Sequence, residues 1–93
     1  MFSWDARKAR RNLKKHRVSF EEAATVFADP EALEWEDALH SETETRLKRL
    51  GCSTFGRILI LVYTLRRATN EQETIRIISA RRASPKEREA YFG

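Results

Sequence analysis

The stretch FGRILILVYTLRRATNEQETIRIISARR, residues 55–82, decides the fold of this 93-residue chain. Ile58–Tyr63 is a continuous run of aliphatic and aromatic residues, too short for a membrane helix and of the length of a buried strand. Thr74–Ala80 is a second run of this kind. The polar segment between them, Arg67–Glu73, is typical of the loop of an antiparallel hairpin. The sequence therefore predicts two paired central strands.

Arginine side chains frame this predicted hairpin. It contains six of them and no lysine: Arg57, Arg66, Arg67, Arg76, Arg81 and Arg82. A charge at a strand end often serves only to keep the strand from pairing with other chains. Arginine also binds phosphate through two parallel hydrogen bonds, whereas lysine acts as a point charge. The number of arginines favours phosphate binding for the group as a whole.

Two helices are predicted before the hairpin. Asp5 is a suitable N-cap for a helix that runs to about Lys15. Ser19 and Glu22 have the spacing of a capping box that opens a second helix. That helix must end before Pro30, because the residue before a proline is disfavoured in the helical region.

The remaining segments predict short elements around these helices and the hairpin. Phe2–Trp4 either adds an edge strand or packs over the core. Leu33–Trp35 and Thr45–Leu50 are expected to be strands, separated by a polar loop at Asp37–Thr43. Ser84–Glu87 is a second capping box, which opens a short C-terminal helix.

This order predicts a single α+β domain over residues 1–93. Consecutive strands with short connections pair antiparallel, so we expect one antiparallel sheet with meander topology. The two N-terminal helices should form one helical layer on it, followed by the short C-terminal helix. Either Ile60 or Val62 should face the helices.

The net charge of +4 is unevenly distributed along the chain. Residues 1–20 carry seven basic side chains and one acidic one, and residues 21–44 carry nine acidic side chains and no lysine or arginine. Residues 45–93 carry eleven basic and four acidic side chains. Such a chain can present one basic face to a polyanion. The acidic block either contacts a basic partner or is solvated, and the basic first helix is either solvated or contacts phosphate.

The sequence lacks the residues that disulfide-bonded proteins, metalloproteins and membrane proteins require. The single cysteine, Cys52, allows no internal disulfide and no cysteine-rich metal site. No apolar run has the length of a membrane helix or of a signal peptide, which indicates a cytoplasmic protein without membrane contact. Two histidines and scattered carboxylates show no metal-ligand spacing, and three glycines form no phosphate loop. We therefore expect neither a metal nor a cofactor.

The remaining side chains suit the cleavage of RNA without metal. Internal attack by a 2′-hydroxyl needs a group to accept its proton, cations for the charged intermediate and an acid for the leaving oxygen. Arginine, lysine, histidine and tyrosine supply these groups.

A long series of residues in this order resembles the BrnT family, the toxins of bacterial type II toxin–antitoxin systems. The residues that carry the resemblance are Phe2-x-Trp4-Asp5, Lys8, Asn12, Lys15-His16, Val18-Ser19-Phe20-Glu21-Glu22-Ala23, Val26-Phe27, Asp29-Pro30, His40-Ser41-Glu42, Arg46, Gly51, Gly56-Arg57, Tyr63-Thr64, Arg66 and Ile75-Arg76-Ile77-Ile78-Ser79-Ala80-Arg81. The family commonly has glycine where this chain has Arg17, a position that suits a left-handed helix cap.

The resemblance implies a RelE-like ribonuclease fold, RNA as the substrate and growth arrest as the outcome. It also implies a BrnA-type antitoxin, a ribbon–helix–helix protein that neutralises the toxin and represses the operon together with it. Operator DNA would then be bound only through the antitoxin complex. The function expected on this basis is that of a metal-independent endoribonuclease.

The family pattern supports a set of site residues, and their chemistry suggests a role for each. Arg66 and Arg81 are expected to contact the phosphate and stabilise the transition state, with Arg46 as a third cation. Either His40 or His16 is expected to carry the proton. The expected RNA-binding residues are Lys14, Lys15, Arg57, Arg76, Arg82 and Tyr91, the last of which either stacks on a base or helps in proton transfer.

A second function from a different class also fits the sequence. A non-catalytic basic module would bind an antitoxin-like partner and contribute to operator DNA binding, because a basic face binds RNA and DNA alike. Incubation of the partner-free protein with RNA in the presence of a chelator distinguishes these two functions. Cleavage supports the ribonuclease, and intact RNA favours the non-catalytic module.

Overall fold

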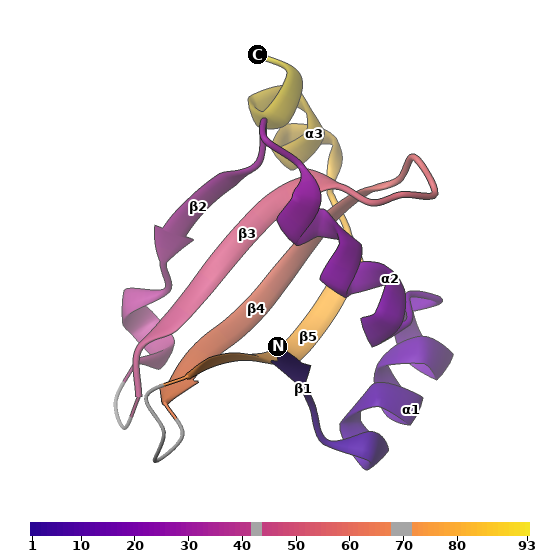
Figure 1. Cartoon of the computed structure of the whole chain (residues 1–93). Coiled ribbons are helices and arrows are strands. Elements are labelled where there is room, and N and C mark those ends of the chain that lie inside the picture. The colour runs from indigo at the N-terminus through magenta and orange to yellow at the C-terminus, as the bar shows by residue number, and fades with distance from the viewer. Residues whose placement is uncertain (42–43, 68–71) are drawn as a thin grey trace.

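The structure, a computed structural model, describes residues 1–41, 44–67 and 72–93 (Figure 1). The helices and strands follow one another in the predicted order, with two short 3₁₀ helices (η1 and η2) in addition. The elements are β1 (Phe2–Ser3), α1 (Ala6–His16), α2 (Phe20–Ala24), η1 (Thr25–Ala28), β2 (Leu33–Glu36), η2 (Ala38–His40), β3 (Arg46–Cys52), β4 (Ile58–Arg67), β5 (Glu73–Arg82) and α3 (Pro85–Phe92).

The strands of the described residues form one sheet in the order β1-β5-β4-β3-β2. Strands β2 to β5 pair antiparallel as a meander, as predicted. The prediction of a purely antiparallel sheet is wrong, because β1 pairs parallel with β5. Both roles open to Phe2–Trp4 are realised. Phe2 and Ser3 form the edge strand, next to which the Ile75 N–H donates to the Met1 carbonyl at 2.8 Å, and Trp4 packs against the core.

Helices α1 and α2 cover one face of the sheet (Figure 1). The core between them and the sheet consists of Val18, Phe20, Ala23, Val26, Leu59, Leu61, Ile77 and Ala80. The expectation that Ile60 or Val62 faces these helices is wrong. Successive strand residues point to opposite faces, so Leu59 and Leu61 face the helices and both named residues face away.

The second helix is shorter than its pattern predicts. After Ala24 the chain tightens into η1, which lies close against β3. Gly51 permits this approach, because a Cβ atom there would lie 2.8 Å from Val26 Cγ1. The expected loop at Asp37–Thr43 contains η2, and residues 42–43 lie outside the described residues. Residues 68–71 of the expected hairpin loop lie outside them as well.

The other face of the sheet is partly covered by α3, so the prediction of a single helical layer is wrong. Leu50, Ile58 and Ile60 are apolar side chains on this second face, and they are buried with Tyr91 of α3 packed against them. The Tyr91 hydroxyl donates to Asp29 Oδ2 at 2.6 Å and fixes the end of the helix. No helix of the described residues packs on the rest of this second face, and we call it the open face.

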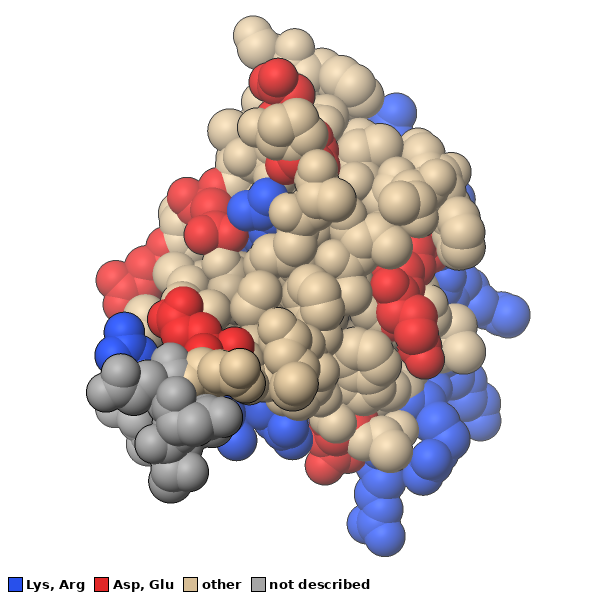
Figure 2. Space-filling view, viewed as in Figure 1, with Lys and Arg blue, Asp and Glu red and all other residues tan. Residues whose placement is uncertain are grey.

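Charge is divided across the helix-covered side of the molecule. Figure 2 shows basic side chains gathered over α1 and acidic ones along the edge formed by β2. In the described part of the chain, no helix has the length and apolar character needed to cross a membrane.

Candidate active site

The strand register arranges the basic side chains of the open face in rows. Residues directly opposite one another on neighbouring strands share a face, and every second residue of a strand returns to it. From the end covered by α3, the rows are Leu50–Ile60–Arg81, Lys48–Val62–Ser79, Arg46–Thr64–Arg76 and Arg66–Thr74. Cations from three different strands therefore lie on one surface.

A hollow of about 260 Å³ lies in the first two rows. It brings together side chains from α1, β3, β4 and β5 and combines two cations with an imidazole. Its lining residues are His16, Lys48, Ile60, Val62, Ser79, Ala80 and Arg81. We call it the Arg81 hollow.

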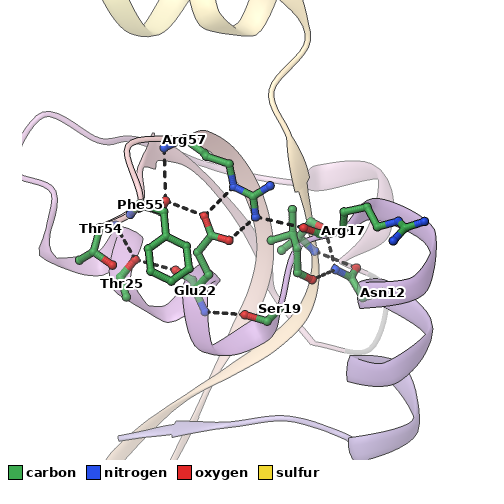
Figure 3. A network of polar contacts seen from close by, with 11 residues as sticks. Asn12, Arg17, Ser19, Glu22, Thr25, Thr54, Phe55 and Arg57 are labelled. Carbon is green, nitrogen blue, oxygen red and sulfur yellow. Dashed lines mark hydrogen bonds and ion pairs between the residues drawn. The ribbon is translucent and has the colours of Figure 1, made fainter.

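Asn12 holds α1 against the edge of β5 beside this hollow. Its side-chain amide donates to the Ala80 carbonyl at 2.7 Å and accepts from the Ala80 N–H at 3.1 Å, as a neighbouring strand would. The same amide also donates to the Val18 carbonyl at 3.0 Å (Figure 3). His16 follows Asn12 by one helical turn and is thereby brought to the hollow.

Arg81 is held by the first turn of α3. Its guanidinium donates to both carboxylate oxygens of Glu87, at 2.8 and 2.9 Å. These hydrogen bonds lower the pKa of Glu87 to about 2 and raise that of Arg81. Glu87 also accepts from the Ser84 N–H in a capping box, so its position is fixed by the helix start.

Arg66 lies at the opposite end of the open face from Arg81. Arg81 is opposite Ile60, and Arg66 follows six residues later on the same strand, which separates the two rows by about 20 Å. Arg66 instead approaches Glu44, with 3.5 Å between guanidinium and carboxylate. The structure therefore does not bring together the two arginines expected to share one phosphate.

The two candidate proton carriers lie in different places. His16 lines the Arg81 hollow. His40 lies in η2 with a largely exposed side chain, and its Nδ1 is 2.9 Å from Asp37 Oδ2. The Asp37 N–H donates to the Arg46 carbonyl at 2.8 Å, so His40 belongs to the end of the sheet where β3 begins.

Arg57 points away from the open face and supports the fold. Its guanidinium forms a two-pronged ion pair with Glu22, whose side chain is only 2% exposed, and donates to the Arg17 carbonyl at 3.0 Å (Figure 3). The hydrogen bond from Arg57 holds the pKa of Glu22 below its usual value. Glu22 also accepts from the Ser53 hydroxyl at 2.7 Å. We therefore leave Arg57 out of the proposed RNA surface.

Arg82 also lies on the helix-covered side, since it is opposite Leu59. It lines a separate hollow of about 290 Å³ with Arg57 and Arg88. Arg82 does not line the Arg81 hollow.

The other expected RNA-binding residues are divided between two surfaces. Arg76 lies on the open face opposite Thr64. Lys15 lines a shallow hollow on α1 beside His16, whereas Lys14 lies with Leu13 on a different side of the helix. The hydrogen bond to Asp29 raises the pKa of Tyr91 to about 12, which does not suit proton transfer near neutral pH.

Comparison with known proteins gives the family. The family model described as the ribonuclease toxin BrnT of type II toxin–antitoxin systems matches residues 4–87. The chain belongs to the BrnT family. A crystal structure of the Brucella abortus ribonuclease toxin BrnT is similar, with a TM-score of 0.63 and 21% sequence identity over 90% of this chain and 97% of that one. This likeness confirms the shared fold. No curated protein matches the sequence significantly.

Three residues of the candidate site were given no role from the sequence. Lys48 was identifiable, because it follows Arg46 by two residues in a predicted strand and so shares its face. Asn12 and Ser79 belong to the family pattern, but their roles depend on the packing of α1 against β5 and on the register.

Among residues 1–41, 44–67 and 72–93, no three side chains of histidine, cysteine, aspartate or glutamate converge as ligands. The groups gathered in the Arg81 hollow are instead cations and an imidazole.

Proposed function

We propose that this chain is a metal-independent endoribonuclease toxin that cuts RNA in the Arg81 hollow. The observation that carries the proposal is the convergence of Lys48, Arg81 and His16 in one hollow of the open face. The family supplies the ribonuclease activity and the type II setting. The open face supplies a surface for the RNA strand, and the cytoplasm is where the toxin would meet it.

The proposed reaction needs the groups of this hollow and solvent water. The 2′-oxygen attacks phosphorus and loses its proton to His16, while the P–O bond to the 5′-oxygen breaks and that oxygen takes up a proton from water. The products are a 2′,3′-cyclic phosphate and a 5′-hydroxyl. Lys48 and Arg81 stabilise the negative charge that develops on the phosphorane oxygens. Imidazole is the side chain that most readily exchanges protons near neutral pH.

The RNA strand would continue from the hollow along the open face. Arg46, Arg66 and Arg76 lie further along it and supply cations for flanking phosphates. Trp35 on the edge strand β2 is opposite Lys48 and 41% exposed, which gives a base an aromatic ring to stack on. In this arrangement Arg66 binds the strand and Arg81 contacts the reacting phosphate.

The decisive test is cleavage without metal. Purified, antitoxin-free protein is incubated with RNA in a chelator, and the ends of the products are analysed. We expect cleavage with cyclic phosphate and 5′-hydroxyl ends, and no cleavage of an RNA that carries 2′-deoxyribose at the scissile position. Activity that requires added Mg²⁺, or products with 5′-phosphate ends, would overturn the proposal.

The proposed partner is a BrnA-type ribbon–helix–helix antitoxin. A type II toxin acts together with a protein antitoxin, and the resemblance to BrnT specifies the BrnA type. Operator DNA would be bound through the complex of the two. Coexpression with a BrnA-type protein should restore growth, and the toxin alone should not shift operator DNA in a gel.

One observation favours the alternative of a non-catalytic module that binds an antitoxin-like partner and contributes to operator DNA binding. Arg66 and Arg81 both pair with carboxylates, which reduces the positive charge that each offers to the transition state of RNA cleavage. RNA that remains intact both with and without ribosomes, combined with operator binding by the toxin alone, would support this alternative.

A further inference from the structure

Thr64 is an unusual residue of the open face. It is 1% exposed, and its hydroxyl oxygen is the buried side-chain polar atom that lacks a hydrogen-bond partner within the described residues. Tyr63 beside it packs its ring against Phe27 on the helix-covered side, so Thr64 points to the open face. A buried hydroxyl without a partner is rare in proteins and requires an explanation.

Two arginines flank Thr64 in its row. Arg46 of β3 and Arg76 of β5 are both directly opposite it, and their backbones lie about 10 Å apart, two strand spacings. Their long side chains can therefore meet above Thr64. Because the two guanidiniums carry like charges, bringing them together is unfavourable without an anion between them.

Arg46 and Arg76 differ from four other arginines of the chain, each of which pairs with a carboxylate. Arg49, Arg57, Arg66 and Arg81 each form an ion pair with a glutamate. In the described part of the chain, no ion pair joins Arg46 or Arg76 to a carboxylate. Their donors are therefore available to an external acceptor.

We propose that Arg46, Thr64 and Arg76 form a second phosphate-binding subsite, which holds a phosphate of the RNA strand next to the one that is cleaved. This inference rests on the proposed function, because it takes RNA as the ligand. The phosphate accepts from both guanidiniums and from the Thr64 hydroxyl, the combination of charged and neutral donors that phosphate oxygens require.

The position of the subsite agrees with an extended strand. Thr64 follows Val62 by two residues and Ile60 by four, which places it about 7 to 13 Å along β4 from the Arg81 hollow. Helix α3 packs on Leu50, Ile58 and Ile60 at the other end of the face. Arginine side chains that turn toward a phosphate would expose the Thr64 hydroxyl.

The test measures binding and cleavage separately. Binding uses a fluorescent, non-cleavable 2′-O-methyl RNA oligonucleotide at several salt concentrations. Cleavage uses two RNAs, one of several nucleotides and one dinucleotide that contains only the scissile phosphate. The variants are Thr64→Val, Arg76→Gln and Arg46→Gln, with Arg67→Gln as the control. Arg67 lies on the same strand as Thr64 but alternates to the other face.

Each variant has its own expected result. Thr64→Val should weaken binding of the 2′-O-methyl RNA about tenfold without changing its salt dependence, because only a hydrogen bond to a charged group is lost. Arg46→Gln and Arg76→Gln should weaken it and reduce the salt slope by about 0.7 each. All three should raise KM for the longer RNA by a much larger factor than KM for the dinucleotide. Arg67→Gln should change neither.

The melting temperature shows whether a loss of binding is a folding defect. Valine resembles threonine in shape and leaves no unpaired hydroxyl, so Thr64→Val should keep or raise the melting temperature. Unchanged binding in Thr64→Val and Arg76→Gln, with cleavage intact, would overturn the subsite and leave the ribonuclease proposal standing. If the unmodified protein cleaves no RNA, the proposed function fails, and the binding experiment still decides whether the subsite exists.

Discussion

Arg81 donates two parallel hydrogen bonds to Glu87 across the turn between β5 and α3. The carboxylate therefore lies against the arginine that we propose for the reacting phosphate. An RNA phosphate and Glu87 must share this guanidinium, so the ion pair limits how strongly the free toxin binds RNA.

Removing the charge of Glu87 should strengthen RNA binding. In Glu87→Gln the amide oxygen still accepts from the Ser84 N–H, so the start of α3 is preserved, but Arg81 loses its counter-charge. We expect the Kd for a 2′-O-methyl RNA to fall several-fold and the salt slope to steepen by up to about one contact. Glu89→Gln, on the same helix, is the control. Equal affinity of Glu87→Gln and the unmodified protein would show that Arg81 does not contact the RNA.

The same pair predicts a pH dependence of stability. The folded-state pKa of Glu87 is about 2, below its ordinary value of 4.5. Its contribution is therefore fully present above about pH 4.5 and is lost as the pH falls toward 2. Because Arg81 is 43% exposed, we expect no more than about 1 kcal/mol. Urea unfolding at pH 7 and pH 3 should show a clearly larger difference between the unmodified protein and Glu87→Gln at pH 7 than at pH 3, because at pH 3 part of the contribution remains.

Loss of Arg81 should abolish toxicity, whereas loss of charge on α1 should not. Removing a contact to the transition state typically lowers the rate by about 10² to 10³. Arg81→Ala should therefore be tolerated in bacteria without antitoxin. Arg7→Ala, which removes the same charge from α1, should still arrest growth. The melting temperature of each variant excludes a simple folding defect, and equal arrest by both variants would show that our site assignment is wrong.

The ion pair of Arg57 and Glu22 is expected to serve stability alone. Arg57→Met leaves the Glu22 carboxylate buried without its partner, which should lower the free energy of unfolding by about 3 to 5 kcal/mol. Arg82→Met, which removes a nearby charge that has no ion pair within the described residues, should change it by less than about 0.5 kcal/mol. Chemical denaturation measures both. An Arg57→Met protein that is stable but binds RNA more weakly would show that Arg57 contacts the RNA.

Replacing Arg17 by glycine should increase the stability of the protein. It ends α1 with φ 59° and ψ 31°, the left-handed conformation, and it is the described non-glycine residue with a positive φ. Side chains with a Cβ atom are disfavoured there, so Arg17→Gly should stabilise the protein by up to about 1 kcal/mol. Arg10→Gly, in the interior of the same helix, should destabilise it by a similar amount. A melting temperature that falls in both variants would contradict this explanation.

Much of the fold was predictable because local signals agreed with the tertiary structure. The hairpin strands, the Asp5 and Ser19 N-caps and the capping box of Ser84 and Glu87 lie where the sequence indicates. The predicted capping box at Ser19 is only half formed, because the Glu22 side chain binds Arg57 and Ser53 instead of the Ser19 N–H. The face of each central side chain was not predictable, because a continuous apolar run such as Ile58–Tyr63 shows no alternation. The parallel pairing of β1 was also hidden, since two residues carry no signal of strand direction.

The site was less predictable, since residue type did not reveal position. Arg66 and Arg81 both end a central strand, but antiparallel strands end at opposite sides of the sheet. Arg57 was grouped with the other arginines although it is paired with Glu22 of α2, a contact that depends on how the helix docks. The position of Arg46 and Arg76 on either side of Thr64 becomes visible only when the strand register is known.

The outer edge of β5 has a consequence for the order of folding. Two contacts complete this edge: β1 pairs with Ile75 and Arg76, and Asn12 binds the backbone of Ala80. Both partners come from the first twelve residues, so each contact joins the beginning of the chain to a strand made near its end. Contacts of such large sequence separation form slowly. During synthesis α1 therefore cannot pack against β5 until residue 80 has left the ribosome. The Arg81 hollow is then among the last parts of the molecule to form.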